Sequence, residues 1–348
     1  MALQQPCLIA LFPDHAHAKA IQSDMDYEVT PDQNCNEGYT ISIDGFSQTL
    51  AESNSDTVAT ICNHLIELSE DSQFKESTIK SGRRYQYRFT IPLPINDPNP
   101  TGSLLIEAGA RFPGIADLRI DFKPVKPSPN GLSDVISLLD LITPLGGHHF
   151  ISNGTLTRYD IAIDLWGGSV DQVLVFSKRS QKNGVYTDRN GCPQTVYMGT
   201  PRSNRTVAYT KTYKVTGRGS LRIERRLTGR CKGHEWPAIA DPFRVVQLVH
   251  TRSILPLLDG LIPQQFFDSV RIRGLNRVLA TLATAQRKAI KKILDDPAQS
   301  LLPSTETIWS GWPQLLEESG LGFLLTAGAR DVPSDSDYLT LANYAVGS

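Results

Sequence analysis

Short runs of alternating apolar and polar residues, separated by Pro, Gly and Asn turns, recur along the chain between Arg84 and Leu227. This two-residue period is typical of β-strands with one buried face. It predicts strands at 85–91, 103–108, 118–122, 156–165, 195–198, 206–213 and 220–227, and an earlier one at 39–43. A chain with so many short strands is constrained to build a sheet first and to place its helices around it.

Helical spacing of apolar residues occupies other parts of the chain. It predicts helices at 56–68, 132–142, 169–177, 242–250 and 305–319, an amphipathic basic stretch at 271–293, and a polar turn region at 181–193. Ser169, Asp241 and Ser304 are the expected N-caps. Because a strand–helix–strand series occurs twice, we expect an α+β fold, an antiparallel sheet with flanking helices, followed by a helical C-terminal region.

Charge is strongly segregated along the 348 residues, although the formal total is only −1. Residues 1–80 carry 3 basic and 13 acidic side chains, whereas residues 158–232 carry 15 basic and 5 acidic. The second balance is typical of a region that binds a polyanion, although a solvated basic face would also account for it. The sequence thus divides into an acidic N-terminal region (1–80), an α+β domain (81–232), a helical C-terminal region (233–330) and a loose tail (331–348).

The five cysteines show no CxxC spacing, and no run approaches the ~18 apolar residues of a membrane-spanning helix. We therefore expect a soluble protein of the reducing cytoplasm, without a membrane partner.

Two carboxylates share one face of the strand predicted at 156–165. The two-residue period places Asp160 and Asp164 on the same side as Arg158. At about 3.3 Å per residue they lie roughly 13 Å apart, too far to bind one metal ion without a bend or a further ligand. An exposed strand face with surface acids is the alternative.

Glu224 lies between Arg222 and Arg226 on one face of the strand predicted at 220–227. This arrangement fits a surface ion pair, which contributes little to stability. It fits equally a metal ligand inside a rim of phosphate-binding arginines.

Tyr209, Lys211 and Tyr213 alternate on one face of the strand predicted at 206–213. A phenol with its ordinary pKa of ~10 is a poor nucleophile, but a nearby lysine would favour the phenolate and bind a phosphate. A divalent ion would polarise a phosphodiester for attack. Aromatic–lysine alternation on an exposed strand is the other interpretation.

Four segments, taken in order, resemble the rolling-circle replication initiators. They read Thr-Arg-Tyr-Asp (157–160), Thr-Val-Tyr (195–197), Ser-Asn-Arg-Thr-Val-Ala-Tyr-Thr-Lys (203–211) and Leu-Arg-Ile-Glu (221–224). This family includes the gene II proteins of filamentous phages and the plasmid replication initiation factors, and the resemblance covers about residues 85–230. It implies a relaxase-like domain that nicks one strand at an origin, stays joined to the 5′ phosphate through a tyrosine, and later rejoins the strand to drive rolling-circle replication.

Carried onto this chain, the resemblance implies that Tyr209 is the nucleophile, with Tyr213 as competitor and Lys211 as its electrostatic partner. It implies acidic positions at Asp160 and Glu224, and at Asp164 in the plasmid form of the pattern. Relatives in a wider superfamily hold a metal with a His-hydrophobe-His motif, which this sequence lacks, and the adjacent His148 and His149 are expected in a turn. Binding of Mg²⁺ or Mn²⁺ by the three carboxylates is therefore the hypothesis. DNA contacts are expected from Arg158, Arg202, Arg205, Lys214 and Arg222.

Origin DNA is the expected partner, single-stranded at the nick and duplex nearby, with the basic side of 271–292 either holding duplex or simply solvated. The acidic N-terminal region is interpreted in three ways: as a contact for a host helicase, as a screen for the basic surface, or as a poorly packed extension, which is the interpretation we favour. A plasmid-mobilisation relaxase would use the same chemistry but usually needs the histidine cluster absent here. A non-catalytic DNA-binding regulator would keep the basic region and need no Tyr209.

Overall fold

The computed structural model describes residues 38–51, 55–70, 84–93, 102–123, 131–177, 183–200, 203–212 and 219–327. The predicted tail at 331–348 lies outside these residues, as do Arg202, Tyr213, Lys214 and much of the acidic region 1–80. Among the described residues, no helix has both the length and the apolar character needed to cross a bilayer.

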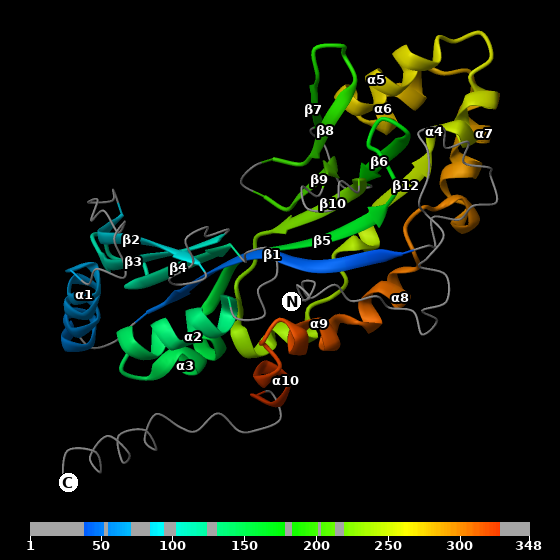
Figure 1. Ribbon diagram of the computed structural model, residues 1–348. Helices are drawn as coiled ribbons and strands as arrows, with labels where there is room; N and C mark the ends of the chain where they lie inside the picture. The colour runs from blue at the N-terminus through cyan, green and yellow to red at the C-terminus, as the bar shows by residue number, and fades with distance from the viewer. Residues whose placement is uncertain are drawn as a thin grey trace, which may run out of the picture.

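A large antiparallel sheet organises the molecule, with strands in the order β2-β3-β4-β1-β5-β10-β9-β8-β7 (Figure 1). Its strands are β1 (Tyr39–Leu50), β2 (Tyr85–Leu93), β3 (Gly102–Ala110), β4 (Leu118–Lys123), β5 (Thr155–Trp166), β7 (Asn183–Thr187), β8 (Pro193–Met198), β9 (Arg205–Thr212), β10 (Gly219–Leu227) and the short β11 (Cys231–Lys232) beside β5. The described structure is therefore α+β with an antiparallel sheet, as the alternation predicted.

β1 lies in the middle of this sheet, hydrogen-bonded to β4 on one side and β5 on the other. Its side chains Tyr39, Ile41 and Phe46 are buried in the core. The boundary predicted at residue 80 consequently does not coincide with a structural one, because the sheet crosses it. The strand predicted at 39–43 is the first part of β1, which continues to Leu50.

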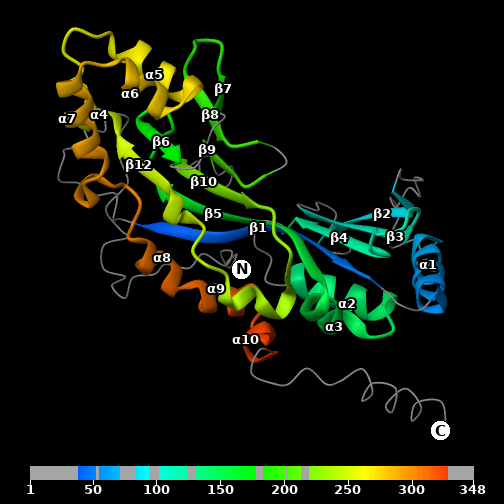
Figure 2. The ribbon, with the colours of Figure 1, turned by 180° about the vertical axis from the view of Figure 1, so that it is seen from behind.

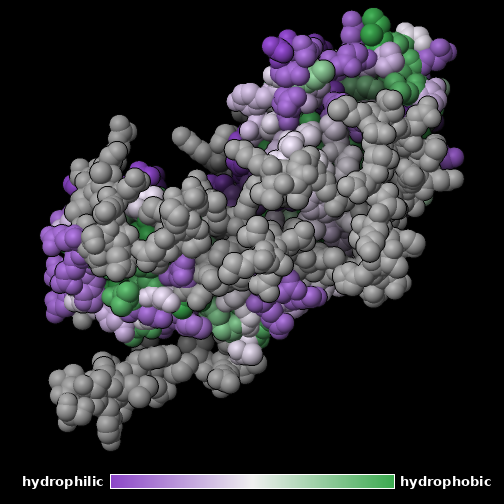
Figure 3. All heavy atoms as spheres, in the orientation of Figure 1, coloured by the Kyte–Doolittle hydropathy of each residue, from purple (hydrophilic) through white to green (hydrophobic). Residues whose placement is uncertain are grey.

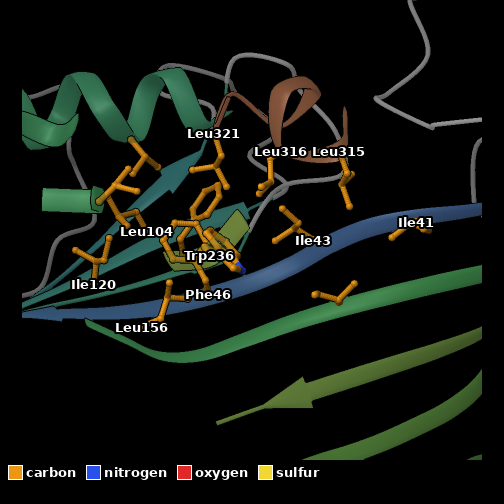
Figure 4. Packing of buried hydrophobic residues seen from close by; sticks show 14 of the residues in the cluster. Ile41, Ile43, Phe46, Leu104, Ile120, Leu156, Trp236, Leu315, Leu316 and Leu321 are labelled. Atoms are coloured by element: carbon orange, nitrogen blue, oxygen red, sulfur yellow. The ribbon is translucent and has the colours of Figure 1, made fainter. Parts of the chain in front are cut away.

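Helices cover the apolar face of the sheet. They include α1 (Ser55–Glu70), α2 (Gly131–Ile142), α3 (Gly146–Asn153), the 3-10 helix Gly233–Ala238, α8 (Thr305–Ser310), α9 (Trp312–Glu318) and α10 (Phe323–Ala327). Figure 4 shows Trp236 beside Phe46, with Leu316 of α9 and Leu321, between α9 and α10, packed over them. The last described helices thus pack on the same core as β1.

A separate two-stranded ribbon corrects two sequence predictions. Residues 173–177 form β6 (Val173–Ser177) and residues 246–250 form β12 (Val246–His250), paired antiparallel, where helices were predicted at 169–177 and 242–250. Both are short β-branched runs whose periodicity does not distinguish buried strand from buried helix. Asp241 was the predicted N-cap, but Pro242 holds that position before the 3-10 turn Phe243–Val245, and Asp241 accepts a hydrogen bond from the Phe243 amide.

The remaining helices form a second core against that ribbon, at the end of the molecule drawn at upper left in Figure 2. They are α4 (Thr251–Ile254), α5 (Pro263–Arg273), α6 (Leu275–Thr281) and α7 (Thr284–Leu294). The amphipathic stretch predicted at 271–293 is broken at Gly274, which has φ +87°. Arg271, expected on the solvated side, is buried and donates hydrogen bonds to the carbonyls of Asp171 and Val173.

Three further local predictions differ from the structure. His148 and His149 lie in helix α3 rather than in a turn. The polar turn predicted at 181–193 contains strand β7. The terminal helix divides at Gly311 into α8 and α9, with Ser304 capping the first of them as predicted.

Candidate functional site

The face of the sheet opposite the core is charged. Register pairing aligns Tyr209, Arg222 and Asp164 in one row across β9, β10 and β5. The next rows hold Glu224, and then Arg205, Arg226 and Asp160. Because residues paired in register point to the same side, the alternation seen in sequence collects these groups on one surface.

Each of the three predicted carboxylates is held by an arginine with two hydrogen bonds. Arg222 donates to Asp164 from Nε at 2.9 Å and from Nη2 at 2.5 Å. Arg226 donates to Glu224 from Nε at 2.7 Å and from Nη2 at 3.0 Å. Such forked pairs fix geometry as well as charge.

The third pair joins two residues of the same strand. Arg158 donates to Asp160 from Nε at 2.9 Å and also from Nη2. Asp160 is only 5% exposed, and this burial raises the pKa of its carboxyl above the ordinary value, although Arg158 opposes the effect.

Asp44 is a site residue that the sequence analysis missed. Between Ile43 and Gly45 the β1–β5 register shifts, so that Asp44 is an extra residue on β1. A bulge of this kind re-aims side chains. Asp44 accepts hydrogen bonds from Nη1 of Arg222 at 2.7 and 2.9 Å. The glycine that follows it, inside a strand pattern, was the available signal.

Arg222 is the central cation of this face, since it contacts both Asp164 and Asp44. Burial alone would lower the pKa of its guanidinium, but the hydrogen bonds to Asp164 and the charge of Asp44 raise that pKa above its usual value. Arg222 therefore stays charged at every working pH.

Tyr209 is half-buried beside Arg222. Burial raises the pKa of its phenol above the usual value, Arg222 lowers it, and the negative charges of Asp44 and Glu224 raise it further. The cation acting most strongly on the phenol is therefore Arg222, from the neighbouring strand. Lys211 lies on the same face of β9, in register with Ser220.

A cavity of about 360 Å³ opens over this face. Its charged lining consists of Asp44, Asp121, Asp160, Glu224, Arg158 and Arg226, and Tyr209 borders it. All four carboxylates have an arginine partner, because Asp44 pairs with Arg222 and Asp121 with Arg119, both outside the lining. A divalent ion would add positive charge for a phosphate that enters the cavity.

The carboxylates fit a divalent ion only in part. Among the described residues there is no group of three or more His, Cys, Asp or Glu placed to hold a metal. Asp160 and Glu224 line the same cavity, whereas Asp164 does not and is bound to Arg222 and Ser220. A pair of carboxylates completed by substrate phosphate is nevertheless a usual way to bind Mg²⁺.

Of the predicted DNA-contacting residues, Arg158 and Arg222 lie in the pairs described above. Arg205 lies on the same face, its guanidinium carbon 3.8 Å from the centre of the Tyr197 ring. Arg202 and Lys214 lie outside the described residues.

Comparison with known proteins leaves the family open. No family model matches the chain, and no curated protein matches it. Among solved structures, it is similar to the di-domain ARO/CYC StfQ from the steffimycin biosynthetic pathway, at 11% identity over 72% of this chain and 97% of that chain, with a TM-score of 0.16. A TM-score this low carries no argument about fold or activity.

Proposed function

We propose that this chain is a replication initiation protein that nicks one strand of origin DNA through Tyr209 and later rejoins it, driving rolling-circle replication of a phage or plasmid. The observation that carries the proposal is the cavity over the charged sheet face, where a tyrosine, two forked arginines and two buried carboxylates meet. These groups suit transfer of a phosphodiester better than binding of a neutral ligand.

The proposed reaction is a transesterification that needs no external oxidant or co-reactant. The phenolic oxygen of Tyr209 forms a bond to phosphorus while the bond from phosphorus to the 3′ oxygen breaks. The phenol loses its proton, the released oxygen gains one, and the products are a 5′-phosphotyrosine and a free 3′ hydroxyl. Rejoining reverses these steps.

The chain's own residues would position the phosphate. Arg158 and Arg226 present planar forks at the cavity wall, and a phosphate competes with Asp160 and Glu224 for them. Bound Mg²⁺ or Mn²⁺ at Asp160 and Glu224 would add positive charge beside the phosphate and polarise the phosphodiester. Arg222 stays beside the phenol and favours its ionised form.

Incubation of the full chain with supercoiled origin plasmid and Mg²⁺ tests this proposal. We expect an open-circular product that carries covalently bound protein, and loss of that product with Tyr209→Phe. Tyr159→Phe, a tyrosine on the opposite face of β5, is the matched control and should nick like the unmodified chain.

A covalent adduct that persists in Tyr209→Phe would remove this residue as the nucleophile. The absence of any nicked product from a competent origin would favour the DNA-binding regulator. Unchanged cleavage in excess chelator would remove Asp160 and Glu224 as metal ligands.

A further inference from the structure

A second feature of the charged face lies beyond the cavity, at the β7 edge of the sheet. Tyr186 pairs in register with Thr195, which itself pairs with Tyr209. Tyr186 and Tyr197 therefore point to the same side as the proposed nucleophile. In Figure 1 their strands, β7 and β8, form a hairpin beside α5.

The two tyrosine rings and Arg205 form a continuous surface, which we call the β7–β9 platform. The rings of Tyr186 and Tyr197 meet edge to face, with centroids 5.4 Å apart. The guanidinium of Arg205 covers the Tyr197 ring at 3.8 Å. Tyr186 at the outer end is 66% exposed, so its ring is accessible to a ligand.

Arg205 differs from the other arginines of this face. Arg158, Arg222 and Arg226 are each held by a carboxylate, whereas no ion pair to Arg205 is found among the described residues. Its Nε is buried and has no hydrogen-bond partner there. An uncompensated guanidinium stacked on an aromatic ring has donors left for a phosphate.

We propose that the β7–β9 platform binds single-stranded DNA by stacking a base on the exposed ring of Tyr186, while Arg205, held over Tyr197, contacts the backbone. Every base has an aromatic face, so tyrosines hold a strand without reading its sequence, and arginine adds charge. Tyr186 lies two strands from Tyr209 in the same row of the sheet, about 10 Å away at the usual strand spacing of ~4.8 Å. Bases held there place the next phosphates over the cavity.

This inference rests on the proposed function for the identity of the ligand, but its test does not require nicking. Fluorescence anisotropy would measure binding of the full chain to labelled dT12 and to an abasic strand of the same length, without added divalent ion. The unmodified chain should bind dT12 more tightly than the abasic strand, because only dT12 offers bases to stack.

Tyr186→Ala should weaken dT12 binding by about 5- to 100-fold and leave abasic binding unchanged, whereas Tyr186→Phe should retain stacking. Arg205→Ala should weaken both ligands, because it removes a phosphate contact. Phe112→Ala, an exposed aromatic on the β3–β4 turn, is the matched control and should change neither.

Equal affinities of Tyr186→Ala and the unmodified chain for dT12 would overturn the platform and leave the nicking proposal intact. If Tyr186→Ala lost affinity equally for dT12 and for the abasic strand, base stacking on this tyrosine would also be overturned. A chain that shows the expected binding pattern but never nicks its origin would retain the platform and lose the proposed function.

Discussion

Paired ions on the charged face are unequal in burial, and this inequality decides which of them matter for stability. Asp164 is 1% exposed and Arg222 is 5% exposed. Removing one member of so buried a pair leaves an uncompensated charge, which typically costs about 3–5 kcal/mol. At the other extreme, Arg88 is half exposed and lies 3.9 Å from Glu107.

Arg222→Met should therefore lower the free energy of unfolding by about 3–5 kcal/mol, measured by urea denaturation. Arg88→Met should change it by less than about 1 kcal/mol. Adding Asp164→Leu to Arg222→Met should recover part of the loss, because no buried charge then remains unpaired. Equal effects of the two single variants would contradict this ranking.

His250 predicts a dependence of stability on pH. Its Nδ1 accepts a hydrogen bond from the Arg252 amide, so the cap needs an unprotonated ring nitrogen. Burial lowers the pKa of His250 below its usual value, and Arg252 lowers it further. The unfolded chain therefore binds this proton more readily, and the stability His250 contributes is full above about pH 6.5 and falls as the pH drops through the folded pKa.

His250→Asn should keep a capping side chain and remove this titration. The melting temperature of the unmodified chain should then fall more between pH 7.5 and pH 5 than that of the variant. Identical falls would show that His250 contributes nothing to the acid sensitivity.

At the scale of single residues, only part of the candidate site could be predicted from the sequence. Alternation correctly placed Asp160 and Asp164 on one face of their own strand, because strand geometry alone decides it. It did not show that Glu224 and Tyr209, on two other strands, lie on the same face of the sheet. It could not show that Asp164 pairs with Arg222, since that contact depends on which strands become neighbours. It could not find Asp44, whose position depends on a register shift between β1 and β5.

At the scale of elements, close approaches of backbone fix how helices sit against the sheet. A Cβ on Gly233 would lie 1.6 Å from the carbonyl oxygen of Ile151, where β11 leads into the 3-10 helix beside α3. A Cβ on Gly219, at the start of β10, would meet nothing within 4 Å. Only a glycine at position 233 allows the backbone to pass this close to Ile151.

Gly233→Ala should accordingly destabilise the protein by about 3 kcal/mol or more, because rigid backbone cannot yield cheaply. Gly219→Ala should stay within about 1 kcal/mol of the unmodified chain. Chemical denaturation of both variants measures the difference, and similar midpoints would refute the tight approach.

Strands could be predicted from the sequence where the alternation of apolar and polar residues was long. β5 and β10 follow strict alternation over many residues and were found from sequence within a residue or two. β6 and β12 are only five residues each and buried on both sides, so they lack alternation altogether. The two strands pair with each other although they lie about seventy residues apart in the chain, and a local sequence pattern cannot show such a pairing.

At the scale of the whole molecule, the described residues form two apolar cores that share the β6–β12 ribbon. Leu248 of β12 is fully buried in the larger core with Trp236, and Leu174 of β6 is fully buried in the smaller one with Phe266. Figure 3 shows hydrophobic surface at the end of the molecule where Figure 1 draws α5 to α7, where Ile262 and Ile272 are exposed. The smaller core is thus attached through the ribbon.

Because one ribbon serves both cores, the described structure should unfold in a single transition. Leu174→Ala and Leu248→Ala should each lower the free energy of unfolding by about 2–5 kcal/mol. Tryptophan fluorescence is the sensitive measurement, since Trp236, Trp309 and Trp312 all belong to the larger core or pack against it. If Leu174→Ala leaves that fluorescence transition unmoved, the two cores unfold independently.

The place of β1 in the sheet has a consequence for synthesis on the ribosome. This strand ends at residue 50, whereas its two partners, β4 and β5, end at residues 123 and 166. Its backbone groups wait through more than a hundred residues of translation before both edges are paired. Pairing at such separation slows folding and lengthens exposure of an unpaired strand. We therefore expect a chaperone to bind this strand while the chain is still being synthesised.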